Sequence, residues 1–284
     1  MASTELPAYA KINLSLDVLK KREDGYHELK MIMQSIELHD VVAIETAGTG
    51  IAVSCDSKWV PSGMENIAGK AALLIAGKYG ITDGLKIHIK KNIPVAAGLA
   101  GGSADAAAVL KGIDDLFSLG IGKSDLMAMG KQIGADVPFC IAGGTRLAEG
   151  IGEKLTALAD FKEVDLVLLK PKIGVSTAWV YKNLDVGKID NRPDTEMLIN
   201  ALSGGDIETV AANMKNVLEG VTIPKYKAVR EAKERLLELG AAGSMMSGSG
   251  PTVFGIFSDR QKAEKAYEAA KDSRWDRFLS STRG

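Results

Sequence analysis

The sequence is poor in the residues that hold structural metal ions or build disulfide scaffolds. Two cysteines, Cys55 and Cys140, and three histidines occur among 284 residues, and there is no CxxC pair. A structural zinc site needs several such ligands at fixed spacings, and a disulfide scaffold needs more cysteines. We therefore interpret both cysteines as small buried side chains in a reducing compartment.

Long apolar runs, export signals and blocks of like charge are also missing. No run reaches the roughly 18 apolar residues of a membrane span. The opening residues, MASTELPAYAKINLSLDV, show no basic segment followed by an apolar core. The net charge is −1, with both signs spread along the chain. These absences predict a cytoplasmic protein that has neither a membrane nor a nucleic acid as its partner.

The composition that is present, 46% hydrophobic and 25% charged residues, is typical of a globular protein. The chain is long enough for one large or two ordinary domains. Helical and strand-like segments are mixed without a regular βαβ alternation, which predicts an α+β fold. A glycine-rich stretch, GGTRLAEGIGEKL, precedes a new buried strand. We therefore expect two domains, at residues 1–158 and 159–284.

Hydrophobic periodicity predicts the individual elements. In the strand at 8–18, apolar residues alternate with polar ones, so one face belongs to the core and the other, with Lys11 and Asn13, faces water or a ligand. Further strands are expected at 29–38, 41–44, 85–89, 164–171 and 252–257. Helices are expected from Asn66 to Gly80, from Ser103 to Gly120, from Ser124 to Gly134, at 207–218 and 225–239, and after Asp259.

The segment NIPVAAGLAGGSADAAAVL, residues 92–110, joins a predicted strand to a predicted helix through a loop of glycine and alanine. The first N–H groups of a helix lack partners, and the helix dipole adds partial positive charge there, so an anion fits. Gly98, Gly101 and Gly102 leave room for a phosphate to approach the backbone. We expect Ser103 to cap the helix and to face a phosphate or its metal ion. The alternative is a flexible turn or close helix packing.

This loop matches neither familiar nucleotide motif. A P-loop requires G-x-x-x-x-G-K-[ST], and the tripeptide GKS at 122–124 has Phe117 where the first glycine should be. The dinucleotide fingerprint G-x-G-x-x-G fails both at Gly98 and at 248–250. A nucleotide bound here would therefore be held by a loop of a third type, different from both motifs.

Four stretches together resemble the GHMP family of small-molecule kinases: AKINLSLDV with DGYHE, PVAAGLAGGSADAA, GADVPF, and MSGSGPTVFGIF. The resemblance covers nearly the whole chain. It implies an ATP- and Mg²⁺-dependent kinase with a two-domain GHMP-kinase-like fold, whose N-terminal domain is similar to the second domain of ribosomal protein S5 and whose C-terminal domain is an α/β sandwich. Within the family, these motifs are similar to those of the member that acts in the non-mevalonate isoprenoid pathway. That member phosphorylates the 2-hydroxyl of a cytidine diphosphate conjugate of methylerythritol.

The resemblance also implies where ATP binds. The adenine would lie near Asn66 and Lys91, and Ser103 would lie near Mg²⁺. Many relatives have glycines where this chain has Ala96 and Ala97, and this departure matters little if both alanines keep a negative φ. The residues that would surround the phosphates are Pro94, Val95, Ala96, Ala97, Gly98, Leu99, Ala100, Gly101, Gly102, Ser103 and Ala104.

Two residues match the family's catalytic pair, Asp136 in GADVPF and Lys11 in AKINLSLDV. The resemblance implies that Asp136 accepts the proton of the substrate hydroxyl. Lys11 would lower the pKa of that hydroxyl and keep Asp136 ionised. The alternatives are an Asx turn before Pro138 and an ordinary solvated strand lysine.

For the acceptor, the resemblance places a cytidine diphosphate group against Tyr26, His27 and Tyr181, because aromatic faces stack on a pyrimidine and an imidazole binds its edge. Trp179 could be the stacking residue instead of Tyr181. Asn13 and Thr177 would lie near the methylerythritol end, and Gly248 would belong to a loop that closes the site. The alternative for that loop is a tight turn before a buried strand.

Two other functions remain open at this point. One is a kinase of the same family that acts on mevalonate, homoserine or a sugar, and it would not need the nucleobase contacts of Tyr26 and His27. The other is a binding module that keeps the fold without turnover. For the kinase of the cytidine diphosphate conjugate, we expect a monomer or a homodimer whose partner is this small-molecule substrate.

Overall fold

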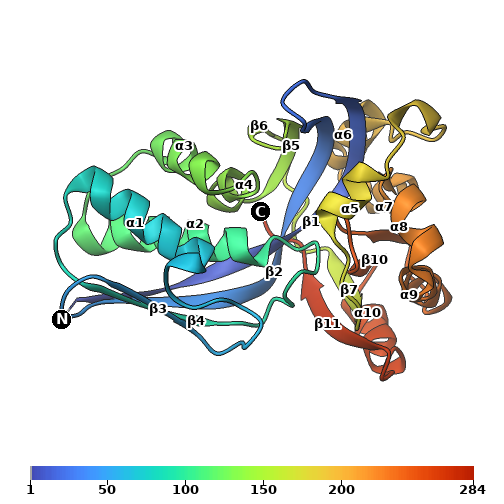
Figure 1. Cartoon of the computed structure of the whole chain (residues 1–284). Helices are drawn as coiled ribbons and strands as arrows, with labels where there is room; N and C mark the ends of the chain where they lie inside the picture. The colour runs from blue at the N-terminus through green and yellow to red at the C-terminus, as the bar shows by residue number, and fades with distance from the viewer. Residues whose placement is uncertain (1) are drawn as a thin grey trace. The chain divides into compact units, whose positions relative to one another are not determined.

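The computed structural model describes residues 2–284 (Figure 1). Its strands are β1 (Ser3–Lys21), β2 (His27–Thr46), β3 (Ile51–Cys55), β4 (Leu85–Lys90), β5 (Thr145–Gly150), β6 (Lys154–Ala157), β7 (Asp165–Pro171), β8 (Lys215–Asn216), β9 (Gly243–Met246), β10 (Val253–Phe257) and β11 (Trp275–Ser281). Its α-helices are α1 (Ile67–Tyr79), α2 (Gly101–Phe117), α3 (Lys123–Ile133), α4 (Val137–Ala142), α5 (Thr177–Lys182), α6 (Thr195–Ser203), α7 (Ile207–Asn213), α8 (Glu219–Lys225), α9 (Lys227–Glu238) and α10 (Arg260–Ala269). Two short 3₁₀ helices, η1 (Gly63–Glu65) and η2 (Val186–Lys188), complete the set.

The chain divides into two compact units that are not consecutive in the sequence. Unit 1 consists of the chain up to Ala10, His39–Val95 and Ala100–Ala142. Unit 2 consists of Lys11–Leu38, Ala96–Leu99 and Gly143–Gly284. The mixture of helices and sheets confirms the predicted two-domain α+β fold, while the expected boundary at residue 158 stays a prediction.

In unit 1, helices α1 to α4 accompany the strands β3, β4 and the second half of β2. Strand β4 pairs parallel with β3 and antiparallel with β2, and it shows the predicted alternation, with Leu85, Ile87 and Ile89 buried. Helix α1 begins and ends as predicted. The Asn66 side chain accepts a hydrogen bond from the backbone N–H of Ala68 at 2.9 Å, and Gly80 ends the helix with a φ of 66°.

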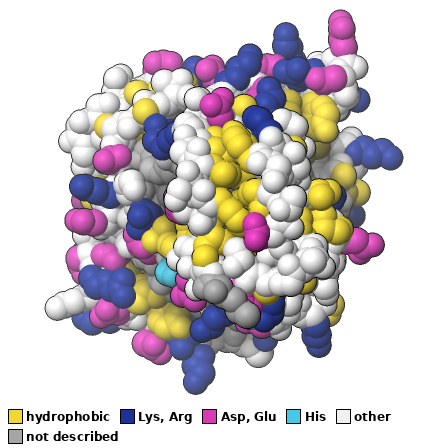
Figure 2. Space-filling view, turned by 90° about the vertical axis from the view of Figure 1, so that its left-hand side faces the viewer, with side chains coloured by type: hydrophobic (Ala, Val, Ile, Leu, Met, Phe, Trp, Pro, Cys, Tyr) yellow, Lys and Arg dark blue, Asp and Glu magenta, His cyan; other side chains and the backbone are white. Residues whose placement is uncertain are grey.

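Helix α1 carries apolar side chains on both of its faces. Ala71, Ala72 and Ile75 are buried, and α1 packs against α2. Leu73 and Tyr79 are exposed on the same helix. Figure 2 faces the side drawn at the left of Figure 1, where α1 and α2 lie, and shows hydrophobic side chains gathered in the middle of that face with charged side chains around them. Unit 1 therefore has a partly apolar outer surface.

In unit 2, a four-stranded antiparallel sheet has the order β11–β7–β10–β9. Helices α9 and α10 pack against it (Figure 1). Strand β7 confirms the predicted continuous apolar strand, because all four residues from Leu166 to Leu169 are fully buried. The remaining strands of unit 2 gather around β1 and the first half of β2, with β5 antiparallel to β2, β6 antiparallel to β5, and β8 parallel to β1.

Several predicted boundaries are wrong. The two strands expected at 29–38 and 41–44 are one continuous strand, β2. The helix expected at 207–218 ends at Asn213, because Met214 turns to an extended conformation and lets β8 pair with Ser15 and Leu16 of β1. The helix expected at 225–239 is α9, and it begins only at Lys227, because Tyr226, with φ and ψ of −116° and 82°, separates it from α8.

Neither cysteine forms a disulfide, and both are only partly buried, whereas the sequence predicts buried side chains. Burial is nevertheless sufficient to raise the pKa of the Cys55 thiol, so Cys55 carries its proton at neutral pH. Among the helices of the described chain, none has the length and apolar content needed to cross a bilayer.

Candidate active site

The glycine loop ends in helix α2, which begins two residues earlier than predicted. The helix starts at Gly101, and its N-cap is Ala100, with a φ of 57°. Ser103 is therefore a residue of the first helical turn, and its predicted role as the cap is wrong. Since alanine has no side-chain acceptor, the first N–H groups of α2 receive no cap from it and face outward for an anion.

Left-handed backbone recurs at every second position of this loop. The φ values are 52° at Ala96, 79° at Gly98 and 57° at Ala100. Ala96 therefore does not meet the condition of a negative φ, whereas Ala97, among the residues described, does. A left-handed conformation costs an alanine about 1–2 kcal/mol. Alternation of left- and right-handed residues turns successive N–H groups toward one concavity, which is a typical anion site.

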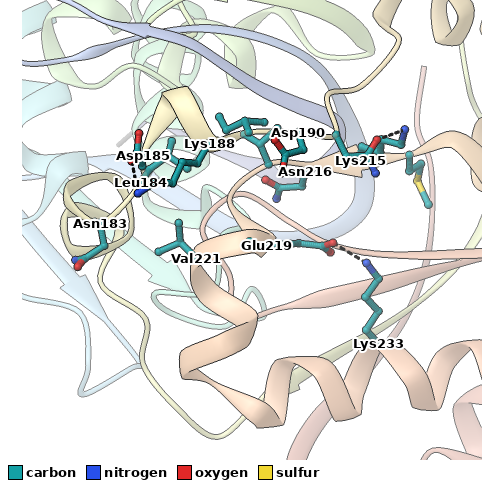
Figure 3. Close-up of a pocket in the computed structure, with 15 residues that line it drawn as sticks. Asn183, Leu184, Asp185, Lys188, Asp190, Lys215, Asn216, Glu219, Val221 and Lys233 are labelled. Atoms are coloured by element: carbon teal, nitrogen blue, oxygen red, sulfur yellow. Dashed lines mark hydrogen bonds and ion pairs between the residues drawn. The ribbon is translucent and has the colours of Figure 1, made fainter.

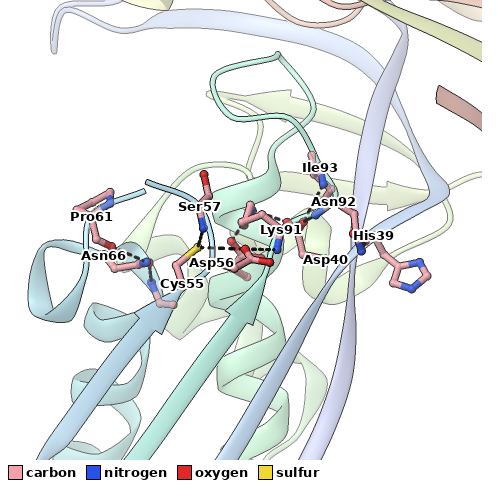
Figure 4. Close-up of polar contacts among 12 residues, drawn as sticks. His39, Asp40, Cys55, Asp56, Ser57, Pro61, Asn66, Lys91, Asn92 and Ile93 are labelled. Carbon is pink, nitrogen blue, oxygen red and sulfur yellow. Dashed lines mark hydrogen bonds and ion pairs between the residues drawn. The ribbon is translucent and has the colours of Figure 1, made fainter. Parts of the chain in front are cut away.

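A buried ion-pair cluster fixes both ends of the loop, as Figure 4 shows in part. The Asp40 carboxylate accepts hydrogen bonds from the backbone N–H groups of Asn92 at 2.6 Å and Ile93 at 2.8 Å, where the loop begins. The Lys91 ammonium donates to the same carboxylate and, at 2.8 Å, to Asp105 Oδ2 in α2. The three side chains are 0–7% exposed. One ammonium thus connects the entry of the loop to its exit.

Two carboxylates share the single ammonium of Lys91, and the burial of this cluster affects the titration of Asp105. Burial raises the pKa of Asp105 to about 7, with a further contribution from Asp40 that Lys91 opposes. Burial lowers the pKa of Lys91, but Asp105 and Asp40 outweigh it and the net shift is upward. Asp105 Oδ1 is buried and has no hydrogen-bond partner within the described chain. We conclude that Lys91 stays charged while Asp105 holds a proton near neutrality.

The predicted adenine-binding residues have different surroundings. Asn66 is buried, caps α1 and donates to the carbonyl oxygen of Pro61 at 3.0 Å (Figure 4). Lys91 directs its ammonium into the buried cluster. An adenine ring could therefore contact only the backbone and the aliphatic part of the Lys91 side chain. The role of Lys91 in adenine binding stays a prediction.

Asp136 lies in the turn between α3 and α4, close to the start of α2. A Cβ on Gly134 in this turn would be 4.0 Å from the Ser103 hydroxyl oxygen. Helix α4, which follows Asp136, packs against α2. Within unit 1, the fold therefore places the turn of the predicted proton acceptor beside the first turn of the helix that follows the glycine loop.

Lys11 is buried on β1 and contacts the centre of the glycine loop. Its ammonium donates to Gly98 O at 3.1 Å and to Asn13 Oδ1 at 2.8 Å, and its side chain belongs to a residue only 5% exposed. The backbone N–H of Lys11 also donates to Leu99 O at 3.1 Å. These contacts rule out the alternative of a solvated strand lysine. A buried ammonium against the loop is suited to stabilise negative charge there.

The second glycine-rich loop, Ser247–Gly250, contacts the same place. The Ser247 hydroxyl donates to Gly98 O at 2.9 Å, and the N–H of Gly248 donates to Asn13 Oδ1 at 3.0 Å. A Cβ on Gly98 would lie 2.3 Å from Ser247 O, so only glycine fits. The structure thus brings Lys11, Asn13 and Gly248 together, as expected of neighbouring site residues.

The predicted pyrimidine-binding residues are partly brought together. The rings of His27 and Tyr181 lie 5.2 Å apart at 31°. Tyr26 is 61% exposed. Trp179 instead lies under the Lys225 ammonium, 3.7 Å from its ring centre. The geometry favours Tyr181 over Trp179 as the partner of His27.

Two further features bear on recognition in unit 2. Burial lowers the pKa of His27, helped by the charge of Lys21, so the imidazole is neutral at pH 7 and can both donate and accept hydrogen bonds. The Thr177 hydroxyl lies 2.7 Å from the Ser249 hydroxyl, which ties α5 to the second glycine loop. Both features place polar groups that a small ligand could contact.

Mg²⁺ has suitable donors in unit 1, although within residues 2–284 no group of three or more His, Cys, Asp or Glu side chains is placed to hold a metal ion. Mg²⁺ in kinases is held mostly by phosphates and water, with one or two oxygen ligands from the protein. The Ser103 hydroxyl and the neighbouring turn of Asp136 fit that requirement.

Some residues of the site were not identified from the sequence. Asp40 lies in the gap between the two strands that the sequence predicts. Its carboxylate accepts hydrogen bonds from the glycine loop because of the register in which β2 pairs with β4. Asn216 lies in the segment at 207–218 that is periodic enough to predict a helix, and Glu219 follows this segment. Asp105, in contrast, is noticeable in the sequence because it follows Ser103 by two residues. Its buried contacts could not be predicted.

The two-domain fold and the glycine loop at the start of α2 define the class of this protein, a small-molecule kinase that uses ATP. Two sequence families match the chain, the GHMP kinases N terminal domain at residues 66–144 and the GHMP kinases C terminal domain at residues 198–276. The chain belongs to the GHMP kinase family.

Similar proteins extend this assignment. The chain is 60% identical to a protein of Acetivibrio thermocellus named 4-diphosphocytidyl-2-C-methyl-D-erythritol kinase, over 99% of this chain and 100% of that protein. A protein of Clostridium botulinum with the same name is 52% identical over 98% and 99% of the two chains. A crystal structure of 4-(cytidine 5'-diphospho)-2C-methyl-D-erythritol kinase aligns with a TM-score of 0.86 at 33% identity, covering 99% of this chain and 100% of that one. Homoserine kinase from Cytophaga hutchinsonii shares the fold, with a TM-score of 0.78 at 18% identity over 100% and 95%.

Proposed function

We propose that this protein phosphorylates the 2-hydroxyl of 4-diphosphocytidyl-2-C-methyl-D-erythritol, using ATP and Mg²⁺, in the non-mevalonate route to isoprenoid precursors. The observation that carries the proposal is the 60% identity, over the full length, to a protein named for that substrate. We further propose that the protein acts in the cytoplasm, as a monomer or a homodimer.

The ATP phosphates would bind along Pro94–Ala104. The alternating left-handed residues Ala96, Gly98 and Ala100 support this, as do the uncapped first N–H groups of α2. Adenine would bind near Asn66 and the stem of Lys91. Bound Mg²⁺ would neutralise phosphate charge, with Ser103 as its protein ligand.

Asp136 would take the proton of the 2-hydroxyl, and the Lys11 ammonium would stabilise the charge that develops on the acceptor oxygen and the transferred phosphoryl group. The first role is supported by the turn that carries Asp136, because Gly134 of this turn lies near Ser103, a residue of the proposed phosphate site. The burial of Lys11 against Gly98 O supports the second.

The cytosine ring would bind at His27 and Tyr181, with Tyr26 as a second aromatic contact. The close ring pair supports stacking there. A neutral His27 has one donor and one acceptor for the edge of the base. Asn13, Thr177 and Gly248 would lie near the methylerythritol end of the substrate.

The test is a coupled assay for ADP with 4-diphosphocytidyl-2-C-methyl-D-erythritol, ATP and Mg²⁺, run beside mevalonate and homoserine. We expect ADP release only with the cytidine substrate, and cytidine diphosphate alone should compete with it. Turnover of mevalonate or homoserine without any effect of cytidine diphosphate would assign the protein to another GHMP activity. Bound nucleotide without ADP from any acceptor would mean a binding module.

A further inference from the structure

A cavity of about 580 Å³ lies in unit 2, lined by residues from Asn183 to Asn191, by Met214–Val221 and by Lys233 (Figure 3). Its lysines are already paired. Lys188 Nζ lies 2.9 Å from Asp185, and Lys215 Nζ donates to Asn191 at 2.7 Å. Both lysines thus have partners within the wall, and two other lining residues, Asn216 and Glu219, contact the second glycine loop.

Asn216 clamps the second glycine loop. Its Nδ2 donates to Met246 O at 2.8 Å and to Gly248 O at 2.7 Å, on either side of Ser247. Its Oδ1 accepts from the N–H of Leu218 at 3.0 Å. The residue is 5% exposed, so both donors and the acceptor are satisfied inside the protein. Buried bonds of this kind fix the backbone they contact, because breaking them leaves polar groups without partners.

Glu219 adds a second support to the same loop. Its Oε1 accepts from the N–H of Met246 at 2.8 Å, and its Oε2 accepts from Lys233 Nζ in α9 at 2.6 Å. Figure 3 shows the Glu219 side chain directed toward Lys233. The loop is therefore held by α8 and, through Lys233, by α9.

Two hydrogen bonds connect the loop that Asn216 holds to Lys11. The N–H of Gly248 donates to Asn13 Oδ1 at 3.0 Å, and the same oxygen accepts from Lys11 Nζ at 2.8 Å. A displacement of Gly248 would release Asn13 Oδ1 to rotate, and Lys11 would lose one of its two acceptors. The position of a buried ammonium within the unit thus depends on a side chain that does not touch it.

We propose that Asn216 is a positioning residue for Lys11, acting through Gly248 and Asn13, with Glu219 and Lys233 as its support. The inference rests on the proposed function, because the position of Lys11 affects the rate only if Lys11 takes part in phosphoryl transfer. Reaction rates are sensitive to displacements of about 1 Å in such groups.

The first experiment compares Asn216→Ala with Asn213→Ala. Asn213 is the matched control, because its Nδ2 donates to Thr209 O at 2.8 Å in α7 and has no bond to the loop. Loss of two buried hydrogen bonds should lower kcat roughly tenfold in Asn216→Ala. The affinity for ATP, measured by equilibrium titration, should stay within about twofold, and Asn213→Ala should match the parent protein.

The second experiment separates positioning from a general structural effect. If Asn216 acts through Lys11, Asn216→Ala should have no further effect on kcat in a Lys11→Met background. Effects that multiply in the double variant would overturn the proposal. Thermal unfolding checks that each variant is folded. If Asn216→Ala does not fold, Lys233→Met replaces it, because this side chain is 28% exposed, and its smaller loss of kcat should vanish in the same background.

The outcome also distinguishes failure of the inference from failure of the proposed function. If Lys11→Met alone leaves kcat unchanged, the proposed role of Lys11 is wrong. If Lys11→Met lowers kcat and Asn216→Ala does not, the proposed function stands and only the positioning role is rejected.

Discussion

The Lys91 ammonium lies 2.8 Å from the Asp105 carboxylate, and both side chains are more than nine-tenths buried. This contact joins the strand before the glycine loop to the helix after it. Asp40, on β2, supplies the second carboxylate of the cluster. The loop is thus fixed at both ends by side chains that lie beneath it.

This cluster predicts a dependence of stability on pH. Burial, opposed by the charge of Lys91 and helped by that of Asp40, raises the pKa of Asp105 to about 7 in the folded protein. In the unfolded chain an aspartate has a pKa of about 3.9. The folded state therefore keeps a proton that the unfolded state releases, so this contribution is fully present below about pH 4 and is lost as the pH rises through about 7.

Replacing Asp105 by Asn should remove that dependence. Urea unfolding of the parent protein should give a falling free energy of unfolding between about pH 4 and about pH 7, and Asp105→Asn should give a flatter profile. Asp115→Asn, at an exposed position of the same helix, is the control and should follow the parent. Parallel profiles for the parent and Asp105→Asn would contradict the assignment.

Gly98→Ala should damage the loop beyond the cost of its backbone conformation. A new Cβ would meet Ser247 O at 2.3 Å, whereas at Gly80, also left-handed, it would meet nothing within 4 Å. Both variants should lose about 1–2 kcal/mol of stability from the strained φ. Only Gly98→Ala should also lower kcat/KM for ATP, by roughly tenfold or more, because it separates the two glycine loops. Equal kinetics in the two variants would show that the contact with Ser247 is unimportant.

Asp136→Asn should lower kcat by roughly 10²–10⁴-fold, the usual range for loss of a general base. The affinity for ATP should be little changed, since in the proposed mechanism the carboxylate would act on the acceptor hydroxyl. Asp125→Asn, at an exposed position in α3, is the control. Steady-state kinetics and isothermal titration with a non-hydrolysable ATP analogue supply the two measurements. Normal turnover by Asp136→Asn would exclude it as the base.

Tyr181→Ala and Trp179→Ala decide which aromatic residue stacks on cytosine. Stacking of a base on an aromatic side chain contributes about 1–3 kcal/mol, so KM for the cytidine substrate should rise roughly 5- to 150-fold in Tyr181→Ala. Trp179→Ala should have a small effect, because its ring is engaged by Lys225. Tyr181→Phe keeps the ring and should stay near the parent value. The opposite ranking would make Trp179 the stacking residue.

The features that local chemistry determines could be predicted from the sequence. Asn66 as an N-cap, Gly80 as a helix end, Asp259 as the cap of α10 and the alternation of β4 depend on neighbouring residues alone, and all four are confirmed. The strand, loop and helix around Gly98 follow from the same kind of evidence.

Features that depend on distant contacts could not be predicted. Ser103 has every local property of a cap, but contacts of the loop with Lys11 and Ser247 hold it in a path that starts the helix at Gly101. The segment around Asn216 has helical periodicity, and pairing with β1 turns it into a strand instead. In both cases tertiary hydrogen bonds outweigh local preference.

The two units share the glycine loop, and this limits how the protein can be divided. Ala96–Leu99 belongs to one unit while the residues on both sides belong to the other, and the partner of Gly98, Ser247, is 149 residues further along the chain. A fragment truncated before Ser247 would retain the whole loop and lose that bond. Separately expressed halves should therefore recover activity only when mixed, as a complementing pair.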